Sequence, residues 1–348
     1  MRYIVDIISR HAQEIQKYLD KGIYNSMSQF ISAAIENQLA LEENELVELK
    51  PNRSAQENLK FSISNETADI GILEKYKLKN IPPFNSTILP PAYLNLVFSS
   101  KNFPEEQAWL WGQINKIFAV KLGLRILHQL LATNQTIELD EFLETAAREA
   151  ANIGDKIREY EKSNDKMRDE KISAALPTTD EKSLNRFKFQ FMVYIRKDNL
   201  LDGAMALMRF CNVDKTKKKH IIGITKSGLM FSSIKNPVLD NGDFDLSLSE
   251  EESMFYISHI KENVKGEYQA MNWLLHQIEE GKNEREILND QIRKSFGSIW
   301  GDTSEAVINT QRAGLTARMH ELGLIEKVKE GIRVKYGVSK MARKLFFK

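Results

Sequence analysis

The sequence has little of what disulfide-linked and metal-stabilised folds require. Its 348 residues contain a single cysteine, Cys211, which excludes an intramolecular disulfide framework and a zinc site built from cysteine thiolates. The six histidines never occur at a metal-ligand spacing such as His-x-x-x-His. We therefore expect no structural metal and no cofactor.

Long apolar runs are also absent. No stretch approaches the ~18 residues that a membrane-spanning helix needs, and the first residues, Met1-Arg-Tyr-Ile-Val-Asp, have no signal-peptide pattern. These absences predict a cytoplasmic protein without a membrane partner.

Catalytic motifs are missing as well, since there is neither a P-loop nor a glycine-rich dinucleotide fingerprint. The densest carboxylates are Asp240, Asp243 and Asp245, followed by Glu250-Glu-Glu, and they raise the possibility of a metal-dependent nuclease. However, Asn241-Gly242 predicts a turn, and Ser249 predicts a capped first helical turn that favours acids. We therefore do not expect an enzyme.

What the sequence does contain is typical of a folded, helix-rich protein. Hydrophobic residues make up 42% and charged residues 28%, and the length fits two or three domains. The net charge is only +1, so any nucleic-acid binding must depend on locally concentrated positive charge.

The first fifty residues change their periodicity. Apolar residues alternate along Arg2–Ile7, which predicts a short strand, and helical spacing follows. Gly22-Ile-Tyr-Asn interrupts the first helix, and Ser26-Met-Ser predicts the start of a second. One strand and two short helices cannot enclose a core alone, whereas two copies can pair their strands over four interlocked helices. The pattern predicts a homodimer through residues 1–40.

This order of elements resembles the ribbon-helix-helix family of DNA-binding proteins. The resemblance rests on the strand Arg2–Ile7, the turn Gly22–Asn25 and the serine-initiated helix Ser26–Ile35. It implies a ribbon in the major groove and a second helix whose N-terminal amides bind a phosphate. The DNA contacts implied are the outward strand residues and the phosphate clamp, namely Arg2, Ile4, Asp6, Asn25, Ser26 and Ser28.

Two of these residues depart from the family pattern. Ile4 and Asp6 stand where base-reading members tend to carry polar or basic side chains. A carboxylate is repelled by phosphates, although it can accept a hydrogen bond from N4 of cytosine. Two interpretations therefore stay open: the module reads bases, or it serves mainly to dimerise.

The C-terminal region has the clearest pattern. Helical spacing predicts helices over 268–280, 284–296 and 304–322, and two alternating segments around Glu330-Gly331 predict a β-hairpin. Three helices followed by a hairpin resemble the winged-helix family, a helix-turn-helix variant. After the hairpin, Val338-Ser-Lys-Met-Ala predicts a closing helix.

A short repeat predicts a second, diverged winged helix upstream. Ile224-Thr-Lys-Ser-Gly has the same layout as Val338-Ser-Lys-Met-Ala, with a β-branched residue, a hydroxyl cap, a lysine and a small residue. It follows a predicted hairpin over 217–224. Before it we expect helices at Glu106–Leu131, Glu138–Ala151 and Leu184–Leu200, with a charged insertion over 155–171. The apolar helix Leu200–Phe210 of this copy is a candidate protein-binding surface.

These patterns divide the chain into four expected parts. Residues 1–48 form the ribbon-helix-helix module, and 49–103, with scattered prolines and polar residues, form a connector. Residues 104–240 form the first winged-helix domain, and 241–348 form the second. The predicted fold class is mainly α with short β elements.

Positive charge is concentrated where winged helices contact DNA. From Thr310 to the end there are ten Lys or Arg and three Glu. The resemblance implies DNA contacts from three elements. The third helix would contribute Thr310, Gln311, Arg312 and Arg318. The second hairpin would contribute Lys327, Lys329, Arg333 and Lys335, and the first hairpin Lys217, Lys218 and Lys219. Gln311 and Arg312 have the chemistry to read adenine and guanine. The alternative is an ordinary solvated basic surface.

The sequence-based hypothesis is a dimeric, sequence-specific transcriptional regulator that binds double-stranded DNA. One alternative is an architectural DNA-binding component of a replication, partition or defence system. Another is a protein-interaction scaffold that uses its winged helices to bind protein. Strong preference for one operator over random duplex distinguishes the regulator from the architectural protein. A scaffold shows no salt-dependent DNA binding.

Overall fold

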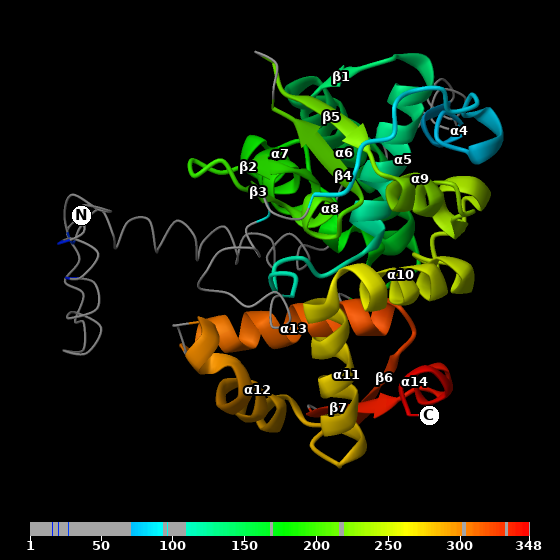
Figure 1. Cartoon of the computed structure of the whole chain (residues 1–348). Coiled ribbons are helices and arrows are strands. Elements are labelled where there is room, and N and C mark those ends of the chain that lie inside the picture. The colour runs from blue at the N-terminus through cyan, green and yellow to red at the C-terminus, as the bar shows by residue number, and fades with distance from the viewer. Residues whose placement is uncertain are drawn as a thin grey trace, which may run out of the picture. The chain divides into compact units, whose positions relative to one another are not determined.

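The computed structural model describes residues 16, 20, 27, 71–92, 96, 109–167, 170–215, 219–300, 304–330 and 333–347. Two compact units divide the chain, Met1–Asn65 and Glu66–Lys348. The strand and clamp residues of the predicted ribbon-helix-helix module, Arg2, Ile4, Asp6, Asn25, Ser26 and Ser28, lie outside the described residues. The second unit is mainly helical with small sheets, as the sequence predicted (Figure 1).

The first half of the second unit surrounds a small antiparallel sheet (Figure 1). Its strand order is β1-β5-β4, with Ile137 opposite Ile222 and Cys211 opposite Ile224. A separate pair, β2-β3, follows a π-helical turn. The elements in chain order are α4 (Gly71–Glu74), η1 (Leu78–Asn80), α5 (Phe118–Thr133), β1 (Ile137–Glu138), α6 (Leu139–Ser163), η4 (Ile172–Ala175), α7 (Glu181–Arg186), η5 (Phe187–Met192), β2 (Tyr194–Ile195), β3 (Leu201–Asp202), α8 (Ala204–Leu207), β4 (Cys211–Asp214), β5 (Ile221–Ile224), α9 (Lys226–Ser232) and η6 (Pro237–Asn241).

Helix α5 is the centre of this half. Every residue from Phe118 to His128 is buried, because the helix is apolar nearly all round and is covered on all sides. Two of the buried residues, Lys121 and Arg125, are charged, and a buried charge requires a partner.

Each buried cation of α5 has a carboxylate partner. Lys121 Nζ lies 2.8 Å from Glu252 Oε1, and the Arg125 guanidinium lies 3.0 Å from the Asp240 carboxylate. Burial lowers the pKa of Lys121 to about 8, although the Glu252 carboxylate opposes the shift. Asp240, one of the clustered carboxylates in the sequence, therefore serves as a structural partner for α5.

The second half contains the C-terminal helices and hairpin. Helix α13 ends at Glu321, and Gly323 turns the chain after it with a φ of +71°, a left-handed conformation that glycine adopts without strain. The predicted three helices, hairpin and closing helix are present close to their expected bounds. The elements are α10 (Glu250–Asn263), α11 (Lys265–Glu279), α12 (Arg285–Trp300), α13 (Glu305–Glu321), β6 (Ile325–Glu330), β7 (Arg333–Val338) and α14 (Lys340–Phe346).

Three of the predicted capping residues cap helices in the structure. The side chains of Thr225 and Ser339 accept hydrogen bonds from Gly228 N and Ala342 N at the starts of α9 and α14, as the repeat predicted. Ser249 and Glu252 form a capping box at the start of α10. These local signals depend only on neighbouring residues, which is why the sequence reveals them.

Several expected elements of the first half were wrong. The helix expected over Leu184–Leu200 is instead α7, the π-helix η5 and strand β2. The expected helix Leu200–Phe210 starts as strand β3 and passes Gly203, whose φ of +90° cannot continue a helix, before the short α8. The helix expected from Glu106 starts at Phe118. Helix α6 continues to Ser163, into the predicted charged insertion.

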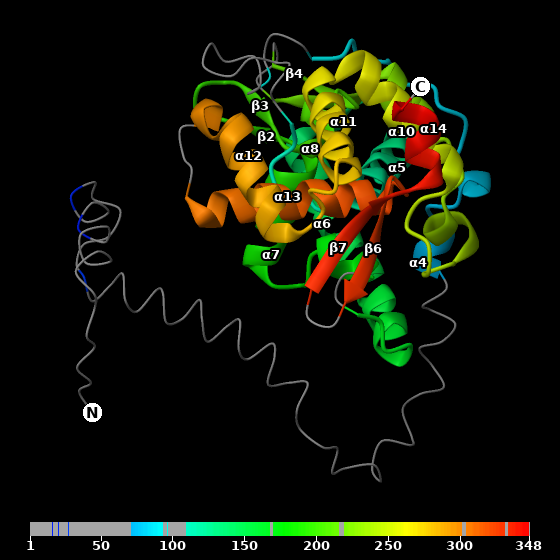
Figure 2. The ribbon, with the colours of Figure 1, turned by 90° about the horizontal axis from the view of Figure 1, so that it is seen from below.

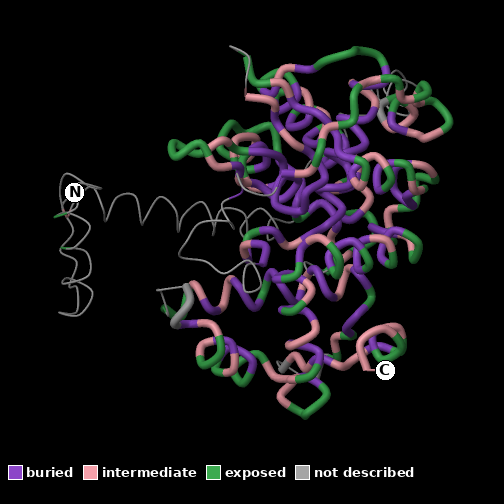
Figure 3. The backbone as a smooth tube through the Cα atoms, in the orientation of Figure 1, coloured by how far each residue is buried: buried purple, intermediate pink, exposed green. Residues whose placement is uncertain are grey.

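One hydrophobic core extends through both halves of the second unit, from Tyr76 to Ala342 (Figure 3). Helix α13 lies between the first-half elements and α12 with the hairpin (Figure 1). It approaches the first half so closely that a Cβ atom on Gly314 would overlap the backbone of Gly112. Glu321, in the last turn of α13, accepts hydrogen bonds from the first amides of α5 at Ile117 and Phe118.

A second buried ion pair fixes α13 against α11. Arg318 Nε lies 2.7 Å from Glu267 Oε1, and both side chains are fully buried. Glu267 Oε2 also accepts a hydrogen bond of 2.8 Å from the Leu110 amide, and Arg318 donates to the carbonyl oxygen of Ile114. This network joins α13, α11 and the irregular segment before α5. Among the described residues, no helix is long and apolar enough to cross a lipid bilayer.

Candidate nucleic-acid interface

The β6-β7 hairpin extends from the C-terminal end of α13 (Figure 2). Its register places Lys327 opposite Tyr336, so these two side chains lie on one face of the hairpin. Tyr336 is buried and Lys327 is partly exposed. Lys329 and Arg333, predicted hairpin contacts, have side chains outside the described part of the structure.

An open groove of about 770 Å³ runs between α13, the hairpin, the start of α12 and the irregular segment before α5. Its floor is formed by small residues of α13, including Ala313, Gly314 and Ala317. The described lining contains three cationic side chains and no carboxylate. Its polar and charged members are Gln113, Asn115, Arg285, Thr310, Arg312, Thr316, Lys327 and Tyr336.

Arg312 is the buried cation of this groove. Its Nε donates a 2.8 Å hydrogen bond to Asn289 Oδ1, and its Nη1 donates a 3.4 Å bond to the Tyr336 hydroxyl. Both partners are neutral. Burial lowers the pKa of the Arg312 guanidinium, and the Arg285 charge acts in the same direction, whereas Tyr336 and the Glu286 carboxylate oppose the shift.

The four residues of α13 that were predicted to contact DNA lie in different environments. Thr310 and Arg312 line the groove, whereas Gln311 lines a neighbouring chamber and is only 6% exposed. Arg318 is fully buried in its pair with Glu267. A guanidinium without solvent access cannot reach a phosphate or a base, so the expectation that Arg318 contacts DNA is corrected.

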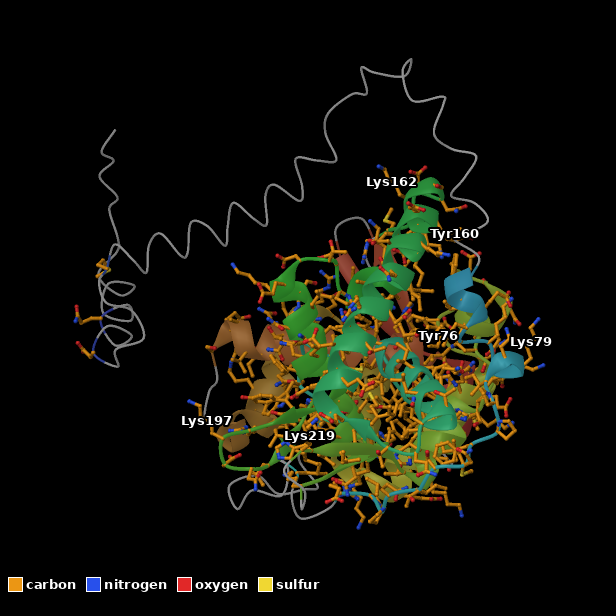
Figure 4. All side chains as sticks on the ribbon, turned by 90° about the horizontal axis from the view of Figure 1, so that it is seen from above. Tyr76, Lys79, Tyr160, Lys162, Lys197 and Lys219 are labelled. Carbon is orange, nitrogen blue, oxygen red and sulfur yellow. The ribbon has the colours of Figure 1, made fainter. Side chains whose placement is uncertain are left out.

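Two of the predicted cationic side chains are paired with carboxylates at the surface. Lys335 Nζ lies 3.8 Å from Glu284 Oε1, and Lys219 Nζ lies 2.6 Å from Glu138 Oε1. The hydrogen bond with Glu138 raises the pKa of Lys219. Such exposed pairs contribute little stability, so they leave each lysine able to exchange its partner. Lys219 lies at the rim of the body (Figure 4), and Lys217 and Lys218 lie outside the described residues.

Sequence reasoning missed five polar or charged residues of the groove, namely Gln113, Asn115, Arg285, Thr316 and Tyr336. Arg285 stands in the charged run Glu284-Arg-Glu, which resembles an ordinary solvated helix start. Gln113 and Asn115 lie in a segment that forms no regular element, so no periodicity indicates which way they face. Their neighbour Gly112 carried the only usable signal, because glycine permits close backbone approach.

No protein-family model matches the chain, and neither does any curated protein or any solved structure. Among the described residues, no group of three or more His, Cys, Asp or Glu side chains is placed to hold a metal ion. The second unit is therefore defined by its own geometry, as a mainly helical body with a cationic groove between α13 and a β-hairpin.

Proposed function

We propose that the chain binds DNA and that DNA phosphates occupy the groove between α13 and the β6-β7 hairpin. The observation that carries the proposal is the convergence of Arg285, Arg312 and Lys327 from three separate elements on one groove. No carboxylate accompanies them in the described lining. Phosphate oxygens accept charge-assisted hydrogen bonds from guanidinium and ammonium groups, so a DNA backbone suits a groove that three such groups line.

The proposal keeps the winged-helix order of elements but assigns the DNA contacts to different residues. The order of three helices, hairpin and closing helix supports it. In a winged helix that reads the major groove, the third helix projects into DNA. Here Gln311, Arg312 and Arg318 of α13 are all buried, so the proposed contacts come from the groove beside the helix and from the hairpin.

We further propose that the protein acts as a dimer through residues 1–40, with the ribbon-helix-helix resemblance as the basis. Such a dimer would carry two copies of the groove, which suits a transcriptional regulator that binds two half-sites. Light scattering on the full chain should give twice the mass of one chain. A mass of one chain at micromolar concentration would contradict the dimer without affecting the groove.

Removing two of the groove cations should weaken DNA binding strongly. We expect the double variant Arg285→Ala/Lys327→Ala to bind a short duplex at least about tenfold more weakly, because each phosphate contact releases counterions. The slope of log K against log salt should become shallower by about one for each lost contact. Fluorescence anisotropy across a salt series, with the full chain and a labelled duplex, measures both quantities.

A charge-matched control separates the groove from general positive charge. Lys226→Ala/Lys235→Ala likewise removes two positive charges from exposed side chains, but neither residue lines the groove. This control should bind like the wild type. Equal losses of DNA affinity in the two double variants would mean that the groove is no specific site and that its cations are an ordinary solvated basic surface. If the wild type binds no DNA at low salt, the proposal fails and the protein-interaction scaffold is favoured. If it binds promoter and random duplex with equal affinity, the architectural DNA-binding protein is favoured over the regulator.

A further inference from the structure

A second chamber, of about 440 Å³, adjoins the cationic groove. Gln113 and Thr310 line both spaces, so a ligand can extend from one into the other. The chamber differs from the groove in its chemistry, since it has aromatic, amide and carboxylate side chains and no cation in its described lining. The residues that carry this chemistry are Trp111, Gln113, Phe189, Gln190, Asp202 and Gln311.

From this arrangement we propose that the cleft binds single-stranded DNA, with a nucleobase in the chamber and its phosphates in the groove. The proposal rests on the proposed function and specifies its ligand. Aromatic faces beside a cationic track are the two features that single-strand binding proteins combine, since bases stack on the rings while the backbone follows the charge.

Phe189 supplies the exposed aromatic face. It is 43% exposed, lies in the π-helical turn η5, and has its ring centroid 5.1 Å from that of Tyr194, which is 38% exposed. Two neighbouring rings left open to water are unusual in a fold that buries most of its aromatic residues. Phe189 lines the chamber and offers a stacking surface there, with Tyr194 packed beside it.

Gln311 places an unsatisfied hydrogen-bond acceptor in the lining of the chamber. Its Oε1 is buried and has no hydrogen-bond partner among the described residues, and the residue is only 6% exposed. A buried acceptor without a donor is destabilising, so a ligand that brings an N–H group is favoured. The amino groups of adenine and cytosine and the ring N–H of thymine are such donors.

The geometry favours a single strand over a duplex. A base inside a duplex is stacked and paired, and only its groove edges are accessible. The chamber lies beside α13, and its volume falls in the range of small-ligand pockets. A base can enter it only after leaving the stack, and this step costs least in a strand that is already unpaired.

The test compares a short labelled single strand with the same strand annealed to its complement. For the full-length wild type, we expect tighter binding of the single strand. Phe189→Ala should weaken single-strand binding by about tenfold or more, because base stacking on an aromatic ring is lost. Phe189→Trp should retain the affinity, and duplex binding should change less than about twofold in either variant.

Met230→Ala is the matched control, because Met230 is also exposed, at 51%, and lies on α9 away from the cleft lining. It should leave both affinities unchanged. If duplex binding depends on Arg285 and Lys327 but Phe189→Ala has no effect on the single strand, this inference fails and the proposed function stands. If neither nucleic acid binds, both fail. Displacement of the strand by micromolar free mononucleotide would overturn the assignment in favour of a nucleotide ligand.

Discussion

Replacing Glu267 with glutamine should lower the free energy of unfolding by about 3–5 kcal/mol. The substitution keeps the size of the side chain but leaves the Arg318 guanidinium as an uncompensated charge in the interior, where both side chains are fully buried. It also weakens the acceptor of the Leu110 amide hydrogen bond. Urea unfolding followed by circular dichroism measures the difference.

The same helix provides the control. Glu279 of α11 pairs with Arg343 at the surface, where the side chains are 35% and 53% exposed. Glu279→Gln should therefore cost less than about 1 kcal/mol. Comparable losses for the two variants would show that solvent reaches the Arg318–Glu267 pair. Replacing both buried partners with apolar residues should recover only part of the loss, because the carbonyl oxygens of Ile114 and Leu110 would lose their donor.

Gly314→Ala should destabilise the protein although alanine is the better helix former. At an uncrowded helical position, this change would gain up to about 1 kcal/mol. Here the added methyl group would overlap the backbone of Gly112, which cannot move aside as a flexible side chain can. We expect a net loss of about 1–3 kcal/mol from overpacking, measured as a lower urea midpoint.

Gly337 in β7 is the control for this prediction. A Cβ atom at Gly337 would have nothing within 4 Å, and its φ is not in the left-handed region. Gly337→Ala should therefore be neutral or slightly stabilising. A wild-type urea midpoint for Gly314→Ala would mean that α13 and the segment before α5 can separate at little cost.

The sequence predicted those parts of the fold that depend on neighbouring residues. The caps Thr225, Ser249 and Ser339, the stop at Gly323 and the hairpin after it were all recognisable. The π-helical turn η5 and the irregular segment before α5 were not. Their conformations depend on packing against residues far along the chain, which leaves no periodic signal.

The candidate site shows the same limit. Arg312 and Arg318 stand six residues apart on α13 and have the same side chain, so the sequence offered both as DNA contacts. Only Arg318 meets a buried carboxylate, and that carboxylate is 51 residues earlier in the chain. Arg312 meets neutral partners and lines the groove. A helix enclosed on most sides presents few of its polar residues to a ligand. Residues far along the chain decide which of them stay accessible.

The contacts made by the end of α13 also set the order of events during synthesis. Arg318 and Glu321 bond to backbone groups of Ile114 and Ile117, each 204 positions earlier. A ribosome that has made α5 must therefore extend the chain through α13 before the first turn of α5 is capped. Until then the apolar surface of the first half stays partly uncovered. Contacts of such sequence separation slow folding and prolong the exposure of aggregation-prone surface.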